Sequence, residues 1–400
     1  MNRKILKMLK LVTCFCVCFL IVEICYVGYS ILNNKESLYF DGVNSITSND
    51  NYFYAVGSNN NNDNKFEKAI LTSYNMNKEK KFEKIYNKGF NSAFFDVEID
   101  SDSIVAVGSY EDDEKSHKDL VRKALFVKYD LDGNIIFERD FTLLDNSKYT
   151  SINIVDDGYL LTGQSVYKST KIGSNDGGAI LAKYDKDGNF IWSKTYCNNK
   201  TAIFNDLVVI DGYIYVVGVD ENYLGVICKY DLDGNFVASN DYRWTDSIGF
   251  SDICNINNRI FVCGANKSGD NWTNSMIVEY DEDCNYVNET IFEGEGINRY
   301  NRIMVDSQDN IIAIGSMKLK KKSSDKTADV FNYDAIIGKY SGSLDKVSVV
   351  TYGDEKDDFF TDITFTNNNY LVSGYSSYED GSYLSKFLRY STALKLLGVE

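Results

Sequence analysis

Residues 179–218, AILAKYDKDGNFIWSKTYCNNKTAIFNDLVVIDGYIYVVG, contain one full copy of the repeat that decides the fold. In this copy Tyr184 is followed by an aromatic residue after 12 positions, by another after 8 more, and by a glycine after a further 14: Tyr196, Phe204 and Gly218. The glycine closes a β-rich run seven times, at Gly57, Gly108, Gly163, Gly218, Gly264, Gly315 and Gly374. The tyrosine ends a strand-like run seven times, at Tyr74, Tyr129, Tyr184, Tyr230, Tyr280, Tyr340 and Tyr390. An internal repeat of this length is typical of a propeller, a solenoid or an array.

Each copy contains four segments that alternate in the manner of strands. One copy predicts strands at about 150–155, 159–163, 179–184 and 190–195. Asp-Gly closes its first hairpin and Asp-x-Asp-Gly-Asn the second, with glycine supplying a positive φ. Solenoids need shorter repeats and parallel rungs, so the sequence predicts an all-β, seven-bladed β-propeller of four-stranded antiparallel blades. The expected blades are 43–86, 94–141, 149–196, 204–242, 250–292, 300–352 and 360–400.

The block Tyr-Asp-x-x-Gly-Asn-x-x-Trp, clearest at residues 184–192, resembles the repeat of bacterial secreted or membrane-anchored β-propeller proteins. The resemblance covers about residues 38–400 and implies an extracytoplasmic propeller. Such repeats specify a fold far better than they specify a function.

The N-terminal region has the features of a membrane anchor or a signal peptide. Four basic residues precede an apolar run at 11–32 that only Glu23 interrupts. Twenty-two residues are enough to span a bilayer as a helix, and the basic flank predicts that everything after the run lies outside the cytoplasm. A cleaved signal peptide is the alternative, because a carboxylate in hydrocarbon is costly. We therefore expect an anchor or signal helix within residues 1–33, a linker at 34–42 and the propeller at 43–400. The protein is then anchored in the cell membrane, or secreted if the helix is cleaved.

The composition argues against several classes of function. The chain has 42 Lys and Arg against 58 Asp and Glu, a net charge of −16, which argues against nucleic acid as a partner. It contains one histidine, His117, and no phosphate-binding glycine motif. The sequence therefore predicts no cofactor, no metal and no particular catalytic residue. The Asp-x-Asp-Gly-Asn blocks fit tight turns better than calcium loops, whose glycine stands at position 6.

Two groups of residues are candidates for binding a ligand. All large length variation falls between the glycine and the next tyrosine, so it lies on one face of the ring, which we call the variable face. The opposite face, the turn face, carries the short hairpin turns. Two residues after the inner aromatic, a polar ring is expected at the channel mouth, with candidates Asp96, Asp206, Asp252, Arg302 and Asp362. The alternative is that these short polar side chains bond loop amides. A basic loop is expected to meet an anionic polymer or an acidic patch through Lys318, Lys320, Lys321 and Lys322.

Together these features predict an extracytoplasmic binding or assembly module whose partner is an envelope protein or glycan. The alternative is a carbohydrate-active or other hydrolase, which needs only two suitably spaced carboxylates at the channel mouth.

Overall fold

The computed structural model describes residues 42–59, 66–77, 79–112, 121–144, 146–166, 177–196, 202–242, 247–268, 272–294, 296–322, 329–353, 356–377 and 383–399. In these ranges every regular element is a β-strand, and residues 41–400 form one compact unit. The predicted apolar helix at 11–32 lies outside the described residues. Inside them, no helix has the length and apolar character needed to cross a membrane.

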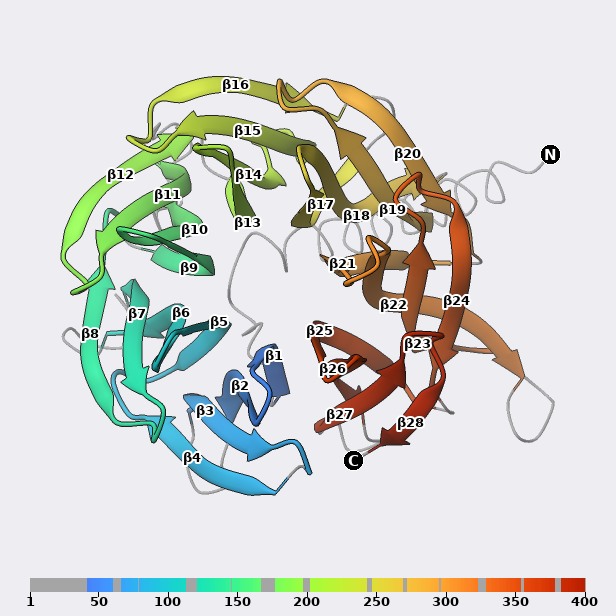
Figure 1. The fold of residues 1–400 in the computed structure, drawn as a ribbon, viewed down its shortest axis with the longest axis horizontal. Helices are drawn as coiled ribbons and strands as arrows, with labels where there is room; N and C mark the ends of the chain where they lie inside the picture. The colour runs from blue at the N-terminus through green and yellow to red at the C-terminus, as the bar shows by residue number, and fades with distance from the viewer. Residues whose placement is uncertain are drawn as a thin grey trace, which may run out of the picture. The chain divides into compact units, whose positions relative to one another are not determined.

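The strands repeat in groups of four from the centre outward (Figure 1). The innermost strands are β1 (Gly42–Ser48), β5 (Ser92–Asp100), β9 (Asn146–Val155), β13 (Ile203–Ile210), β17 (Ser247–Ile256), β21 (Asn298–Val305) and β25 (Asp358–Thr366). The second strands are β2 (Tyr52–Asn59), β6 (Ser103–Glu111), β10 (Gly158–Val166), β14 (Tyr213–Val219), β18 (Arg259–Ser268), β22 (Ile311–Lys322) and β26 (Asn369–Ser377). The third strands are β3 (Lys68–Asn75), β7 (Arg122–Asp130), β11 (Gly177–Asp185), β15 (Gly225–Asp231), β19 (Trp272–Tyr280), β23 (Asp329–Tyr340) and β27 (Tyr383–Ser391). The outer strands are β4 (Lys80–Tyr86), β8 (Ile135–Phe141), β12 (Phe190–Tyr196), β16 (Phe236–Asp241), β20 (Tyr286–Phe292), β24 (Lys346–Tyr352) and β28 (Leu396–Val399).

The sheet topology corrects the predicted number of blades. Five sheets have four antiparallel strands each: β1–β4, β13–β16, β17–β20, β21–β24 and β25–β28. The remaining eight strands, β5–β12, form a single sheet in which Arg122 of β7 pairs in parallel with Asn146 of β9. The prediction of seven separate blades is therefore wrong: the propeller has five four-stranded blades, and the two repeats between Ser92 and Tyr196 share one sheet.

The shared sheet has a local cause. Only four residues separate β8 from β9, fewer than at any other passage from an outer strand to the next innermost strand. This short connection brings the first residue of β9 beside the first residue of β7, where one bridge joins the two halves. Aromatic spacing carries no information about such a bridge, so the repeat pattern alone could not reveal it.

The ring closes without an exchanged strand in the described residues. Strand β1 pairs only with β2, and it packs against β25 and β26 of the last sheet. The contact is apolar, with Ile46 and Phe53 against Leu371. It is also hydrogen-bonded, because the backbone N–H of Ile46 donates to Asp362 Oδ2 over 2.7 Å.

The repeating aromatic residues form the core between neighbouring repeats. At the inner position each of Phe94, Tyr149, Phe204, Phe250, Tyr300 and Phe360 is at most 1% exposed. Phe94 lies against Tyr86 of the preceding repeat at a ring-centroid distance of 5.8 Å. Burying large aromatic surfaces is strongly stabilising, so the spacing that repeats in the sequence is the spacing of inter-repeat contacts.

The seven repeat glycines permit a β-bulge that redirects the polar residues of the innermost strands. In β13 the bulge falls between Phe204 and Asp206, and it presses the Ile203 carbonyl against Gly218 of β14. A Cβ at Gly218 would overlap that carbonyl oxygen, and the other six repeat glycines face an equivalent oxygen. Because a bulge bends its strand and redirects the next side chain, the residue two positions after the aromatic turns toward the neighbouring repeat.

Candidate functional site

The predicted polar ring exists, and Arg302 is its centre. From β21 its guanidinium approaches three carboxylates: Nη1 lies 3.5 Å from Asp252 Oδ1, Nε 3.6 Å from Asp362 Oδ1 and Nη2 3.9 Å from Asp96 Oδ1. These carboxylates come from β17, β25 and β5, so one side chain bridges innermost strands on different sides of the ring. We call Asp96, Asp206, Asp252, Asp362 and Arg302 the carboxylate ring.

The second oxygen of each aspartate ties one innermost strand to the next. In every case Oδ2 accepts a hydrogen bond from a backbone N–H of the following repeat: Ile152 to Asp96 at 2.9 Å, Ile253 to Asp206 at 3.2 Å, Ile303 to Asp252 at 2.6 Å and Ile46 to Asp362 at 2.7 Å. Where the ring position is serine, its hydroxyl donates to the next aspartate, as Ser45 does to Asp96 over 2.9 Å. The aspartates therefore hydrogen-bond backbone amides, which was the alternative to ligand binding in the sequence analysis. The amides belong to adjacent strands rather than to loops.

The electrostatics of the ring follow from its excess of carboxyl groups. Burial raises the pKa of Asp96 to about 6, although the Arg302 guanidinium opposes the change. Burial and then the Asp96 charge raise the pKa of Glu98, two residues further along β5, to about 8. The pKa of Asp252 is raised by burial and by the neighbouring charge of Asp206. One guanidinium cannot balance the four carboxyl groups of the ring and that of Glu98, so this cluster retains protons near neutral pH.

This arrangement makes the carboxylate ring a structural tie across the channel. Its oxygens are occupied by amides, hydroxyls and Arg302, whereas glycoside hydrolysis needs one carboxyl as acid and another as base or nucleophile. Nothing in the ring favours the hydrolase alternative. His117 lies outside the described residues, within which no group of three or more His, Cys, Asp or Glu is placed to hold a metal.

The four predicted lysines belong to a strand, which corrects the expectation of a basic loop. All four lie on β22, which with β23 forms the longest hairpin described, 12 residues in each strand. The register sets Lys318 opposite Tyr333 and Lys322 opposite Asp329. The Lys318 ammonium lies 5.5 Å from the Tyr333 ring centroid. A run of lysines lacks the apolar alternation that marks a strand, so the sequence pattern suggested a loop.

The hairpin and the carboxylate ring are separate features. The C-terminal end of β22 extends beyond the outer strand β24 in Figure 1, whereas Arg302 stands on the innermost strand of the same sheet. The structure thus brings the aspartates and Arg302 together and leaves the lysines apart.

Sequence reasoning missed three charged residues on the innermost strands: Glu98, Lys148 and Arg299. Lys148 and Arg299 both stand one position before the inner aromatic, where the other repeats have small or apolar residues. That fixed offset was the available signal, and a comparison of the repeats position by position would have found it.

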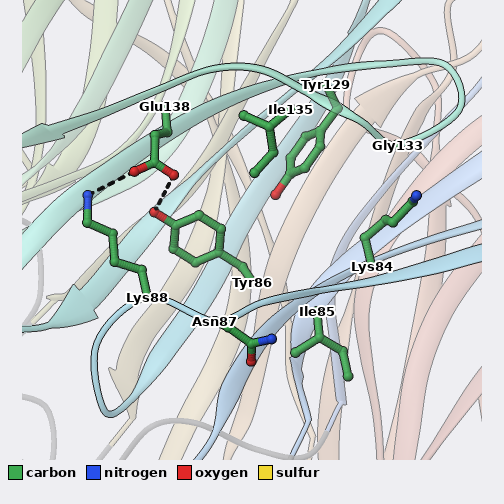
Figure 2. Close-up of a pocket in the computed structure, with 9 residues that line it drawn as sticks. All are labelled: Lys84, Ile85, Tyr86, Asn87, Lys88, Tyr129, Gly133, Ile135 and Glu138. Carbon is green, nitrogen blue, oxygen red and sulfur yellow. Dashed lines mark hydrogen bonds and ion pairs between the residues drawn. The ribbon is translucent and has the colours of Figure 1, made fainter.

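A groove on the outer rim lies between β4 and β8. It has a volume of about 440 Å³, and Figure 2 shows Glu138 between Lys88 and Tyr86. The Lys88 ammonium lies 3.0 Å from Glu138 Oε1, and the Tyr86 hydroxyl donates to Oε2 over 3.2 Å. An equivalent groove of about 530 Å³ is lined by Tyr196, Tyr230 and Phe236. Lys88 and Glu138 of the first groove therefore pair with each other, and Lys84 also lines this groove.

The Asp-x-Asp-Gly-Asn blocks form turns on the turn face. Asp185 Oδ1 accepts the amides of Asp187 and Asn189, and Oδ2 accepts the Asn189 side chain. These hydrogen bonds lower the pKa of Asp185, and the bond from the Asn189 side chain has the largest effect. Gly188 adopts a φ of 75°, as the turn requires.

Comparisons with known proteins agree on the fold alone. No family model matches the chain, and no curated protein matches it. Among solved structures, Sqt1 from Chaetomium thermophilum is 12% identical with a TM-score of 0.50, over 88% of this chain and 82% of that one. The Dos1 propeller is 10% identical with a TM-score of 0.50, over 84% and 91%. The polysaccharide lyase Uly1 is 10% identical with a TM-score of 0.51, over 90% and 91%. At identities this low, the similarity supports the β-propeller fold of the chain and supports no activity.

Proposed function

We propose that this protein is a binding or assembly module that recognises an anionic component of the cell envelope through its variable face. The observation that carries the proposal is the contrast between the two faces. Three residues separate β18 from β19 and ten separate β6 from β7, whereas the turn-face connections contain only two to five residues. A constant scaffold with variable connections on one side is the usual arrangement of a binding surface.

The carboxylate ring supports this function by making the scaffold rigid. Its hydrogen bonds join innermost strands that come from different repeats, so the strands that carry the variable connections are held in a fixed arrangement. A ligand then meets a pre-organised surface and does not have to order it, which reduces the entropic cost of binding.

Charge suggests the chemistry of the partner. The chain as a whole is strongly acidic, yet β22 carries four lysines and its C-terminal end extends past the outer strand β24 in Figure 1. A local basic patch on an acidic protein attracts an anionic partner and repels it elsewhere, which fixes the orientation of binding. The envelope location in this proposal depends on the predicted membrane helix at 11–32, and nucleic acid is not expected as a partner.

The test uses the full chain in detergent, immobilised and offered acidic and neutral envelope glycans and fractionated envelope proteins. Lys318→Glu combined with Lys320→Glu should reduce capture of the anionic partner at least tenfold. Lys395→Glu, an exposed lysine of the β27–β28 turn on the turn face, is the matched control and should leave capture unchanged. Equal capture by the hairpin variant and the control would contradict the proposal, as would equal loss in both.

A further inference from the structure

We propose that the outer strand β24 is a self-association surface, which pairs antiparallel with β24 of a second copy of this chain. Among the described strands β24 is hydrogen-bonded to β23 alone, and it is the last strand of its sheet. It stands on the outer rim of the ring in Figure 1, so the backbone N–H and C=O groups of its other edge are open to a further extended strand. This pairing goes beyond the anionic partner of the proposed function and does not depend on it.

The composition of β24 suits it to pair with another strand. Residues 347–352, Val-Ser-Val-Val-Thr-Tyr, contain no charged side chain, and all but the serine are β-branched or aromatic. Such residues favour the extended, half-buried conformation of a sheet. The one charged residue of the strand, Lys346, places its ammonium 5.7 Å from the ring centroid of Phe292 on the neighbouring strand β20. The edge therefore presents six consecutive uncharged residues to a partner.

The other outer strands carry the features that protect an edge from pairing. A glutamate stands at the centre of β4, β8 and β20: Glu83, Glu138 and Glu289. If one of these strands paired antiparallel with its own copy about this centre, two carboxylates would lie opposite each other, which is destabilising. Strand β12 carries Lys194, β16 ends at Asp241, and β28 is only four residues long. Charges and short strands are the usual protection of a sheet edge, and β24 lacks both beyond its first residue.

A second copy of β24 is the partner whose charges and side chains fit this edge. In the antiparallel register centred on Val349, Val347 of each copy faces Thr351 of the other, and Lys346 faces Tyr352. No like charges lie opposite each other, and β-branched residues meet β-branched residues on the exposed positions. Val347 is 57% exposed and Thr351 is also exposed, so both are accessible to a partner strand. Because this register is its own mirror about Val349, the contact closes as a two-fold dimer and does not propagate into a fibre.

The dimer is expected to be weak and to respond to salt in a characteristic way. A contact built on one seven-residue strand from each copy is small, and small interfaces belong to the weak, transient class. The net charge of −16 on each chain opposes the approach of a second copy. Added salt screens this repulsion, so self-association should strengthen as salt rises. Capture of an anionic partner by the lysines of β22 should weaken instead, which separates this proposal from the proposed function.

The experiment measures the mass of the full chain in detergent by sedimentation equilibrium over a range of protein concentrations. The unmodified chain should show a monomer–dimer equilibrium. Val347→Glu combined with Thr351→Glu places glutamates opposite each other and should weaken the dimer at least tenfold. Val347→Lys combined with Thr351→Glu places a lysine opposite each glutamate and should keep the dimer. The matched control is Thr195→Glu combined with Val237→Glu, which adds the same charge at exposed positions of β12 and β16 and should dimerise as the unmodified chain does.

Hydrogen exchange gives a second readout, in which dimer formation should slow the backbone amides of β24 and leave those of β16 unchanged. Several results would overturn the proposal: a monomer at every concentration, a dimer that the two glutamates leave intact, or equal loss in the glutamate and the lysine–glutamate variants. A dimer that persists in the glutamate variant would assign the contact to another part of the chain. Urea unfolding of each variant shows that a lost dimer is not a lost fold, because all four substituted positions are exposed.

Discussion

Replacing Arg302 with methionine should destabilise the propeller by an amount that grows with pH. The guanidinium lies 3.5, 3.6 and 3.9 Å from three buried carboxylates, and methionine keeps the apolar stem while it removes the charge. Removing one partner of a buried ion pair costs about 3–5 kcal/mol when the other charge stays ionised. At pH 9 the ring carboxylates must ionise without their counter-charge, so we expect a loss in this range.

The pH dependence follows from the direction of the pKa shifts. Asp96 and Glu98 have pKa values raised by burial, to about 6 and about 8, from 3.8 and 4.5. Their contribution to stability is therefore full below about pH 4 and is lost as pH rises through the folded-state values. In Arg302→Met these groups keep their protons to still higher pH, so near pH 5 the loss should shrink to about 1–2 kcal/mol, the cost of the missing hydrogen bonds.

Urea unfolding of the full chain in detergent, followed by tryptophan fluorescence at pH 5, 7 and 9, measures this difference. Arg302→Lys should recover part of the loss, because it restores the charge without the planar fork. Asp252→Asn in the Arg302→Met background should recover stability at pH 9, since it removes a charge and keeps the oxygen that accepts the Ile303 amide. A loss that is the same at pH 5 and pH 9, or below about 1 kcal/mol throughout, would refute the electrostatic account of the ring.

Two further substitutions test a repeat glycine and the buried carboxylate of Asp306. Gly218→Ala should cost about 1–3 kcal/mol in urea unfolding, because its Cβ would meet the Ile203 carbonyl; an unchanged midpoint would show that the bulge relaxes. Asp306 has a pKa of about 2, since the Tyr370 hydroxyl and the Asn310 amide outweigh the effect of burial. The free energy of unfolding of the unmodified chain should fall by about 2 kcal/mol between pH 4 and pH 2, and Asp306→Asn should abolish this loss. If the variant loses the same stability over this pH range, Asp306 is not the group responsible.

The strands and the inter-repeat core could be predicted from the sequence because one spacing serves both. Aromatic residues such as Phe204 recur where neighbouring repeats touch, and glycines such as Gly218 recur where a bulged strand presses on its neighbour. These are requirements of packing, so each copy must repeat them. The eight-stranded sheet depends instead on a single bridge, between Arg122 and Asn146, that follows from the length of one connection.

The candidate site was predictable in position but not in role. A fixed offset from the aromatic column identified the aspartates and Arg302, but the offset does not tell whether a carboxylate faces a ligand or the amide of the next strand. That distinction depends on the bulge, which redirects Asp206 toward Ile253. Lys148 and Arg299 escaped notice for the opposite reason, because a cation in only two of seven repeats does not register as a pattern.

The central claim is that the variable face, and not the turn face, recognises an anionic partner. The most direct measurement is lysine acetylation of the full chain, with and without a saturating acidic envelope glycan, read residue by residue by mass spectrometry. The account predicts that the glycan slows modification of Lys318 and leaves Lys395 of the turn face unaffected. Protection centred on Lys395, with Lys318 modified at its unliganded rate, would contradict it.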